Sequence, residues 1–288
     1  MGETIKSMTP QACPACGRIT DHIFRYASNG CDIWQCQSCG LGRAETAGFD
    51  PRAYYTGDYF SGQLSDGYSD YRAAEPVLRR EFARSVEFIH GFRSDGKLLD
   101  LGCAYGFFLK EAERYFDVAG IELAQAAAEY CRGSGLKVLS GVADEANMAQ
   151  IGEVDVITLF DVIEHLPNPF ASLALCRRYL KPGGIIVITT GDFASPVARL
   201  AGSKWRLMTP PQHLWFLTRE SIRRAAPSLG LSLERCDHPT KIVPLSLIFF
   251  QLRRMLGLPS PPKNVSSRIG LPVNLFDAMR LVLRRPLA

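Results

Sequence analysis

The chain has 288 residues, of which 47% are hydrophobic and 22% are charged, and its formal net charge is +4. This length suits one full α/β domain with a small additional module, and the composition is ordinary for a soluble globular protein. The modest positive charge gives no argument for a nucleic-acid-binding protein, which usually carries a concentrated basic patch.

Nine cysteines are distributed unevenly along the chain, and five of them lie within the first 39 residues. The first residues lack a charged segment followed by an apolar one, so no secretory signal is expected. We therefore expect a reducing, cytoplasmic compartment, in which paired cysteines bind metal rather than form disulfides.

Two CxxC pairs mark the N-terminal module, residues 1–44. Cys13 and Cys16 form the first pair and Cys36 and Cys39 form the second; each pair is followed by glycine, and nineteen residues separate the pairs. Two such knuckles present four thiolates to one tetrahedral Zn²⁺, and the glycines allow the turns. The pattern predicts a zinc ribbon with a structural Zn²⁺, because a catalytic zinc would need an open position and a nearby base.

Two segments lead from this module into the main domain, which we expect to span residues 72–288. Residues 45–71 are rich in Tyr, Gly, Asp and Ser, and they are interpreted either as a lid over the site or as a linker packed against the domain. A helix is predicted over residues 72–91, since Leu78, Phe82 and Val86 recur near a period of 3.6.

From residue 97 the sequence alternates between apolar strand patterns and helical patterns. Asn168 is the expected N-cap of one helix, with Pro169 at its first position. This alternation predicts a doubly wound, Rossmann-like α/β fold with a mostly parallel seven-stranded sheet. The predicted strands are 97–101, 118–122, 137–139, 154–159, 185–190, 231–236 and 277–283. The predicted helices are 107–115, 124–132, one from 169 and one over 218–228, with insertions at 191–216 and 239–274.

The turn after the first of these strands has the features of a nucleoside site. Asp100 ends the strand, and Gly102 and Gly106 allow the backbone to approach a ligand closely. About twenty residues further on, Glu122 ends the second strand, where an acidic side chain can accept both hydroxyls of a ribose. The spacing differs from a dinucleotide GxGxxG motif and from a P-loop, so a ligand with ribose but without a bound phosphate is favoured.

Five motifs between residues 97 and 190 follow one another in the order and spacing of class I S-adenosylmethionine (SAM)-dependent methyltransferases, and the chain resembles that family. The motifs are Asp100 to Gly106, Gly120-Ile121-Glu122, Asp155-Val156-Ile157, Asp161-Val162-Ile163-Glu164-His165-Leu166 and Leu180-Lys181-Pro182-Gly183-Gly184. The resemblance implies SAM as cofactor and an enzyme that transfers its methyl group. Ala104 departs from the family pattern, which usually has glycine there, and we expect tighter packing rather than loss of binding.

The resemblance also implies roles for individual residues in this sequence. The first motif would pack against the methionine part of SAM, Glu122 would hold the ribose, and the loop at 142–144 would line the adenine. The cofactor-binding residues implied in this way are Asp100, Gly102, Cys103, Ala104, Gly106, Glu122, Leu123, Val142, Ala143, Asp144, Phe160 and Asp161.

Methyl transfer from a sulfonium mainly requires alignment of the acceptor, and a hydroxyl acceptor also benefits from a general base. His165 and His213 both follow strands at the carboxyl edge of the predicted sheet, and each is a candidate base or, alternatively, a structural hydrogen-bonding residue. The residues predicted to line the acceptor pocket are Asp192, Ser195, Trp205 and Arg206.

The acceptor is expected to be a small molecule, a sugar or a glycan or lipid precursor, and nucleic acid is not expected as a partner. Two alternatives stay open: an RNA methyltransferase in which the ribbon contacts RNA, and a non-catalytic scaffold that binds SAM and zinc. The apolar segment 242–258 is too short to span a bilayer, so no transmembrane segment is expected. It is interpreted as a helix that covers the core, or as a peripheral membrane or dimer contact.

Overall fold

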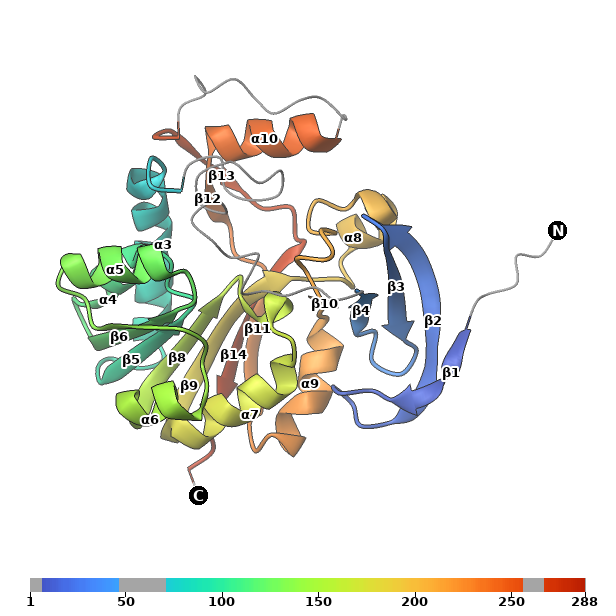
Figure 1. Ribbon diagram of the computed structural model, residues 1–288, viewed down its shortest axis with the longest axis horizontal. Coiled ribbons are helices and arrows are strands. Elements are labelled where there is room, and N and C mark those ends of the chain that lie inside the picture. The colour runs from blue at the N-terminus through green and yellow to red at the C-terminus, as the bar shows by residue number, and fades with distance from the viewer. Residues whose placement is uncertain (1–6, 47–70, 256–266, 288) are drawn as a thin grey trace.

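A computed structural model of the chain describes residues 7–46, 71–255 and 267–287. A seven-stranded sheet forms the centre of the molecule, and a five-stranded sheet built mainly from the N-terminal residues lies beside it (Figure 1). A third, two-stranded sheet and one helix lie together at the top of this view.

The central sheet has the strand order β11-β14-β9-β8-β5-β6-β7. The strands from β7 to β9 are mutually parallel, whereas β14 runs antiparallel to both β9 and β11. The mostly parallel seven-stranded sheet predicted from the sequence is therefore confirmed. Its strands are β5 (Lys97–Leu101), β6 (Asp117–Glu122), β7 (Val138–Ser140), β8 (Val154–Phe160), β9 (Leu180–Gly191), β11 (Ser232–Asp237) and β14 (Ala278–Arg284).

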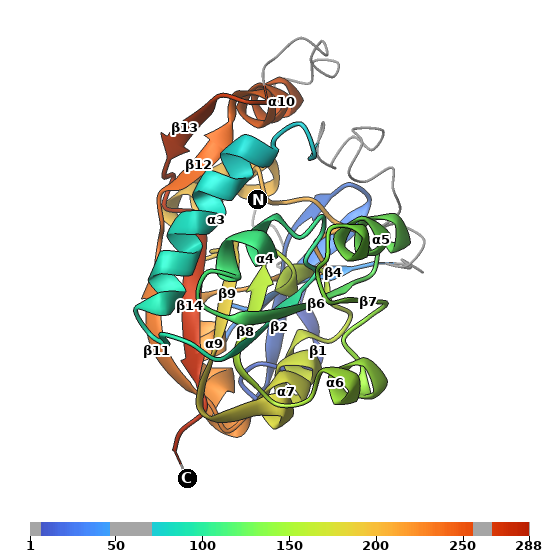
Figure 2. The same cartoon turned by 90° about the vertical axis from the view of Figure 1, so that its left-hand side faces the viewer.

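Helices cover both faces of this sheet, as Figure 2 shows. On one face, α3 (Glu75–His90), α4 (Phe107–Ala112) and α5 (Gln125–Gly133) contribute Val86, Leu109 and Cys131 to one apolar core. On the other face, α6 (Glu145–Ile151), α7 (Pro169–Tyr179) and α9 (Arg219–Ser228) pack Met148, Leu173 and Ile222 into a second core. Burial of both sheet faces explains why β8 and β9 are almost continuously apolar in sequence.

Two predicted helix starts are confirmed by their capping contacts, whereas the helix predicted from residue 72 begins at Glu75. The Asn168 side chain accepts a hydrogen bond from the Ala171 N–H at 3.1 Å, at the start of α7. At the start of α9, Thr218 and Ser221 cap each other's backbone N–H groups at 3.0 Å. Such caps satisfy N–H groups that have no partner within the helix.

The five-stranded sheet has the order β1-β2-β3-β4-β10. Four of its strands come from the cysteine-rich segment, but the fifth comes from the predicted insertion at 191–216. That insertion also contains α8 (Pro196–Ala201) and the short 3-10 helix η2 (Gly202–Lys204). A strand as short as β10 carries no periodicity that a sequence could reveal. The strands are β1 (Ser7–Ala12), β2 (Ile19–Ser28), β3 (Cys31–Cys36), β4 (Gly42–Glu45) and β10 (Trp215–Phe216).

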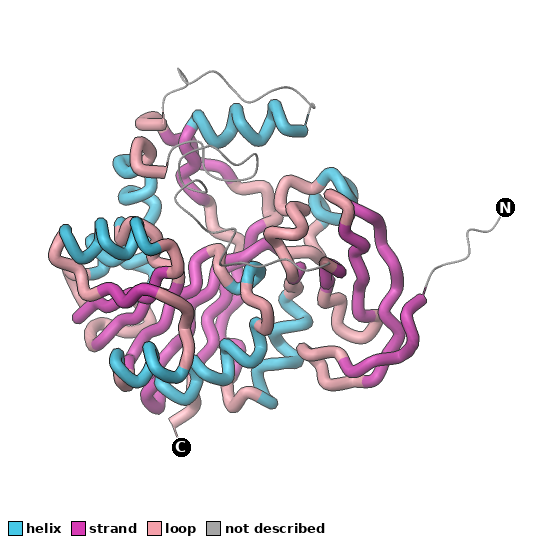
Figure 3. Tube along the Cα trace, viewed as in Figure 1, coloured by secondary structure: helices cyan, strands magenta, loops and turns pink. Residues whose placement is uncertain are grey.

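The described parts of the second insertion, residues 239–255 and 267–274, also form secondary structure. Strands β12 (Lys241–Pro244) and β13 (Gly270–Val273) pair in antiparallel fashion, and α10 (Leu245–Met255) follows β12 (Figure 3). Within α10, Phe249 and Leu252 are about half exposed, so a peripheral contact through this helix stays a prediction. None of the described helices is long and apolar enough to cross a membrane. The predicted lid or linker falls almost entirely on residues 47–70, outside the described residues.

Candidate active site and ligand clusters

In the turn after β5, two glycines have a left-handed backbone and lie so close to neighbouring side chains that a Cβ would not fit. Gly102 has a φ of +72°, and a Cβ on it would lie 2.6 Å from Cγ2 of Val162. Gly106 has the same φ, and its Cβ would lie 2.5 Å from Cδ1 of Leu136. Ala104 also adopts a left-handed conformation, with a φ of +46°, which explains why the family usually has glycine at this position.

Glu122, at the end of β6, is buried and held by the same turn. One carboxylate oxygen accepts a hydrogen bond from the Ala104 N–H and the other from the Ala124 N–H, both at 2.7 Å. Burial raises the pKa of Glu122, and these backbone hydrogen bonds oppose the rise. Each carboxylate oxygen can accept more than one hydrogen bond, so this arrangement is compatible with the ribose contact predicted from the sequence.

Asp100 lies beneath the turn and is also buried. Its Oδ1 accepts a hydrogen bond from the Thr158 hydroxyl at 2.6 Å. Burial raises the pKa of Asp100 to about 7, although the hydrogen bond from Thr158 acts in the opposite direction. The Asp100 carboxyl therefore titrates near neutral pH, unlike an exposed aspartate.

The remaining predicted cofactor residues lie at the carboxyl ends of neighbouring strands. In the loop after β7, the Asp144 side chain caps α6 by accepting the Asn147 N–H at 2.9 Å, and Asn147 donates in turn to the Val142 carbonyl. Beyond β8, Asp161 has a left-handed φ of +54°, and its carboxylate contacts Lys241 Nζ at 2.9 Å. Backbone strain of this kind concentrates at functional sites.

The two CxxC pairs meet as the sequence predicts. The Sγ atoms of Cys13 and Cys39 are 3.6 Å apart, those of Cys16 and Cys36 are 4.0 Å apart, and all four lie within 4.8 Å of one another. A tetrahedral Zn²⁺ with Zn–S bonds of about 2.3 Å requires sulfur atoms about 3.8 Å apart. The four thiols therefore fit a tetrahedral metal site.

This cysteine cluster is attached to the methyltransferase-like part of the chain. The Thr218 hydroxyl, which also caps α9, donates to the carbonyl oxygen of Cys39 at 3.0 Å. Arg224 on α9 donates to the Ser38 hydroxyl at 2.7 Å. The turn that carries the second CxxC pair is thereby joined to the start and the body of α9.

The two candidate bases lie side by side, although they are 48 residues apart in the sequence. The ring centroids of His165 and His213 are 4.7 Å apart, with the rings nearly perpendicular. His165 belongs to the 3-10 helix η1 (Ile163–His165) after β8, whereas His213 precedes β10. Burial lowers the pKa of His165, and the nearby carbonyls of Gln212 and Asp161 oppose this effect.

Three hydrogen bonds hold the two histidine segments together. The Leu214 N–H donates to the carbonyl of Glu164 at 2.9 Å. The His165 ring contacts the Gln212 carbonyl through Nδ1 at 3.0 Å, and the Trp215 indole donates to the Leu166 carbonyl at 3.0 Å. The positions of the two rings relative to each other are therefore set by hydrogen bonds to backbone carbonyls of the two segments.

Glu164 completes this cluster, a role that the sequence analysis did not assign to it. One of its carboxylate oxygens lies within 4.8 Å of ring nitrogens of both His165 and His213. Burial, followed by the negative charge of Asp161, raises the pKa of Glu164 to about 8. The adjacent Glu-His pair was visible in the sequence, but nothing there indicated that His213 would join it.

The four residues predicted to line the acceptor pocket all have partners within the protein. Trp205 and Arg206 both donate to the buried carboxylate of Asp277, and Arg206 does so with two nitrogens at 2.8 and 2.9 Å. Ser195 caps α8, and Asp192 pairs with His238 at 2.9 Å. These contacts orient the insertion against β14, and a direct role in acceptor binding stays a prediction.

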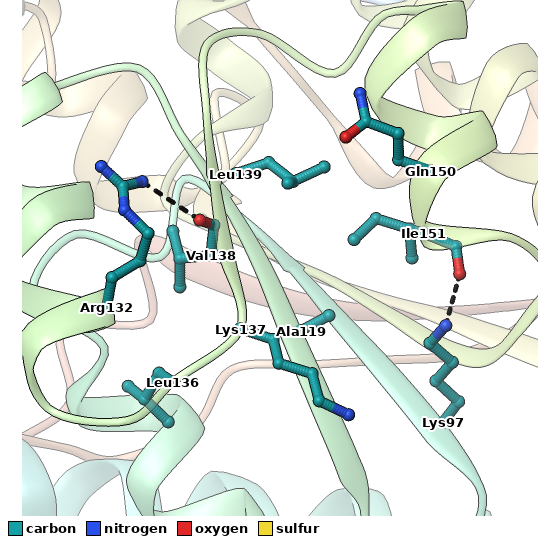
Figure 4. Close-up of a pocket in the computed structure, with 9 residues that line it drawn as sticks. All are labelled: Lys97, Ala119, Arg132, Leu136, Lys137, Val138, Leu139, Gln150 and Ile151. Atoms are coloured by element: carbon teal, nitrogen blue, oxygen red, sulfur yellow. Dashed lines mark hydrogen bonds between the residues drawn. The ribbon is translucent and has the colours of Figure 1, made fainter.

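A hollow of about 360 Å³ lies elsewhere, among the beginnings of β5 and β7, the middle of β6 and the end of α6 (Figure 4). Two of its cationic side chains are engaged with backbone carbonyls, Lys97 with Ile151 and Arg132 with Val138, whereas Lys137 pairs with the carboxylate of Asp117. None of the residues that line it is a predicted site residue, although one of them, Leu136, also approaches Gly106 of the glycine turn.

The strand order and the glycine turn after β5 are those of a class I methyltransferase fold. A family model described as a methyltransferase domain matches residues 72–235, which is more than half of the chain. The chain belongs to this methyltransferase family. The predicted SAM cofactor is supported by both the family and the fold.

Similar proteins include several named ubiquinone biosynthesis O-methyltransferases. The one from Methylococcus capsulatus is 34% identical over 169 residues, covering 54% of this chain and 70% of that protein. The one from Thiobacillus denitrificans is 28% identical, covering 48% of this chain and 65% of that protein. The chain thus spans about two thirds of the length of these relatives.

Solved structures support the fold. A SAM-dependent methyltransferase from Thermotoga maritima superposes with a TM-score of 0.50 at 16% identity, covering 79% of this chain and 98% of that one. A SAM-dependent methyltransferase from Archaeoglobus fulgidus gives the same TM-score and identity, covering 78% of this chain and 97% of that one. At this level of identity the likeness concerns the fold alone.

Proposed function

We propose that the protein transfers the methyl group of SAM to a hydroxyl oxygen of a small molecule, with sugars and glycan or lipid precursors among the candidate acceptors. The observation that carries this proposal is the pair of His165 and His213 beyond the carboxyl ends of β8 and β9. Ligands of doubly wound sheets bind at this edge. The named O-methyltransferase activity of the relatives supports oxygen as the methylated atom.

The cofactor would bind across the glycine turn. Gly102 and Gly106 would admit the methionine part of SAM, Glu122 would accept the ribose hydroxyls, and the loop that contains Asp144 would border the adenine. Val162 approaches Gly102 and lies three residues before His165. This proximity supports a histidine pair next to the methyl donor, where a neutral imidazole would take the proton of an acceptor hydroxyl.

We propose that Cys13, Cys16, Cys36 and Cys39 bind a structural Zn²⁺. The sulfur separations fit tetrahedral coordination, and four thiolates leave no open position on the metal. The zinc would supply no chemistry to the reaction. Its contribution would be to hold the five-stranded sheet, and through β10 the segment that contains His213.

The experiment is an acceptor screen with labelled SAM, in which hydroxylated small molecules are compared with their amine analogues and with bulk RNA. The proposal predicts label in an O-methyl product, identified by mass spectrometry, and a loss of product formation in His165→Ala and His213→Ala. Calorimetry with SAM confirms that each variant still binds the cofactor. Label found in RNA or on nitrogen, or wild-type rates in both variants, would contradict the proposal.

A further inference from the structure

A salt bridge joins the second insertion to the edge of the central sheet where SAM is proposed to bind. Nζ of Lys241, the first residue of β12, lies 2.9 Å from Oδ2 and 3.1 Å from Oδ1 of Asp161. The two residues are 80 positions apart in the chain. A lysine ammonium and an aspartate carboxylate are both charged at neutral pH. The pair therefore presents one positive and one negative charge side by side.

Asp161 lies at the switch point of the central sheet. From β5 the chain continues to β6 and β7 on one side of that strand and then to β8 on its other side. Ligands of doubly wound sheets bind in the crevice beyond the carboxyl ends of two such strands. The glycine turn follows β5 and Asp161 follows β8, and the next residue, Val162, is the one that approaches Gly102. The Asp161 side chain is 48% exposed, so a ligand in this crevice can reach it.

Contacts with α3 hold Lys241 in place. The N–H of the next residue, Ile242, donates to Oε2 of Glu81 on α3 at 2.6 Å. On the paired strand β13, a Cβ on Gly270 would lie 2.5 Å from Cγ1 of Val77, so this hairpin packs closely against the helix (Figure 2). The Lys241 side chain is 26% exposed. A side chain that is already ordered loses less conformational entropy when it binds a ligand.

Both members of the salt bridge keep capacity for further hydrogen bonds. Oδ1 of Asp161 accepts from the Thr189 hydroxyl at 2.9 Å as well as from Lys241. Oδ2 accepts from Lys241 alone among the described residues. A carboxylate oxygen can accept two hydrogen bonds, and a lysine ammonium can donate three. Oδ2 therefore has room for one more donor, and Lys241 has one more proton to donate.

We propose that Lys241 and Asp161 together bind the amino-acid end of SAM, with Lys241 on its carboxylate and Asp161 on its ammonium. This inference rests on the proposed cofactor site. The two groups of SAM are opposite charges on one carbon atom, and the salt bridge offers the complementary pair. A single charged side chain would attract one group and repel the other. Hydrogen bonds between charged groups are also stronger than those between neutral ones.

The proposal assigns a cofactor contact to the second insertion. Lys241 lies beyond residues 72–235, which match the methyltransferase family model, and outside the five motifs of the sequence analysis. The insertion would then do more than cover the domain, because it would supply the positive charge that the crevice needs for the carboxylate of SAM.

The test compares three ligands by calorimetry on the full chain: SAM, decarboxylated SAM, which lacks only the carboxylate, and 5′-methylthioadenosine, which lacks the whole amino-acid end. Lys241→Met should weaken SAM binding at least about tenfold, because it removes a charged hydrogen-bond donor. The same variant should bind decarboxylated SAM and 5′-methylthioadenosine at least as tightly as wild type does. Lys241→Arg, which keeps the positive charge, should recover part of the SAM affinity.

The matched control is Lys137→Met, which removes a lysine that pairs with Asp117 at the opposite end of the strands, at 3.3 Å. It should leave all three affinities unchanged, and thermal unfolding shows that each variant is folded. Equal SAM affinity in wild type and folded Lys241→Met overturns the inference, while the proposed function stands. Tighter SAM binding by Lys241→Met also overturns it, because Lys241 would then only occupy Asp161. An equal loss of affinity for SAM and 5′-methylthioadenosine overturns it as well, since the damage would lie in the nucleoside site. Absence of SAM binding by wild type contradicts the proposed function itself.

Discussion

Trp215 pairs with Arg43 in antiparallel register, so that a strand of the methyltransferase domain extends the cysteine-rich sheet. Next to this pair, a Cβ on Gly42 would lie 2.8 Å from Cβ of Phe216, which shows how closely the two backbones approach. His213 lies two residues before Trp215 in the same segment. The N-terminal module therefore braces one of the two histidines of the candidate site.

Removal of the proposed zinc should impair methyl transfer through this connection. Cys16→Ser is expected to release the metal, to destabilise the five-stranded sheet and to lower the rate of methyl transfer, whereas SAM affinity should change little. Zinc analysis, calorimetry with SAM and a methyl-transfer assay measure the three effects. Cys31→Ser is the control, because Cys31 is buried in the same sheet outside the cluster. Unchanged zinc content in Cys16→Ser would refute the ribbon.

Loss of the Glu122 carboxylate should weaken SAM binding. We expect Glu122→Ala to cost about 1–3 kcal/mol of binding free energy, because it removes a charged acceptor of hydrogen bonds. The structure adds that the N–H groups of Ala104 and Ala124 lose their acceptor, so protein stability should fall as well. Calorimetry and urea unfolding measure these effects, with Asp117→Asn at the opposite end of β6 as control. Wild-type affinity in folded Glu122→Ala would contradict the ribose assignment.

A side chain at Gly102 should distort the cofactor turn. The left-handed backbone alone costs a non-glycine residue about 1–2 kcal/mol, and the approach to Val162 adds to this. Gly102→Ala should therefore lower both the free energy of unfolding and SAM affinity, and Val162→Ala in the same chain should restore part of each. Gly133→Ala, where a Cβ meets nothing within 4 Å, should leave SAM affinity unchanged and stability unchanged or slightly raised. Equal effects of Gly102→Ala and Gly133→Ala on SAM affinity and on the free energy of unfolding would contradict the steric constraint at Gly102.

Asp100 should make stability depend on pH. Its pKa of about 7 in the folded state lies above the usual value of 3.8, so the folded chain binds more protons than the unfolded chain between these values. The free energy of unfolding should therefore fall as pH rises from about 4 to above 7, by at most about 4 kcal/mol from this group. Asp100→Asn keeps an oxygen for the Thr158 hydroxyl and should flatten that fall, which urea unfolding at pH 5 and pH 8 measures. The same pH dependence in wild type and variant would contradict the assignment.

The sequence predicted most of the central domain because its signals are local. Apolar runs, an alternating pattern of strands and helices, the cap at Asn168 and the helix start at residue 218 each depend on neighbouring residues, and the structure confirms them. The two CxxC pairs were equally readable, because two such pairs at this spacing are typical of a metal site. The boundaries were less accurate: β9 begins at Leu180 rather than at residue 185, because the Pro-Gly-Gly segment continues the strand with an irregular register.

Contacts between distant segments were not readable from the sequence. β10 has two residues and no periodicity, so its place in the cysteine-rich sheet depends on backbone pairing with Gly42 and Arg43. Asp277 holds Trp205 and Arg206 across an interval of about seventy residues, which no local pattern indicates.

What the sequence by itself determined is the doubly wound sheet, the cysteine cluster and the glycine turn with Glu122, because each is specified by residues close together in the chain or by a fixed spacing. What only the tertiary structure decided is that His165 and His213, first considered as alternative bases, form one cluster with Glu164. Hydrogen bonds between the loop after β8 and the segment before β10 create that proximity, and such contacts arise only when the chain has folded.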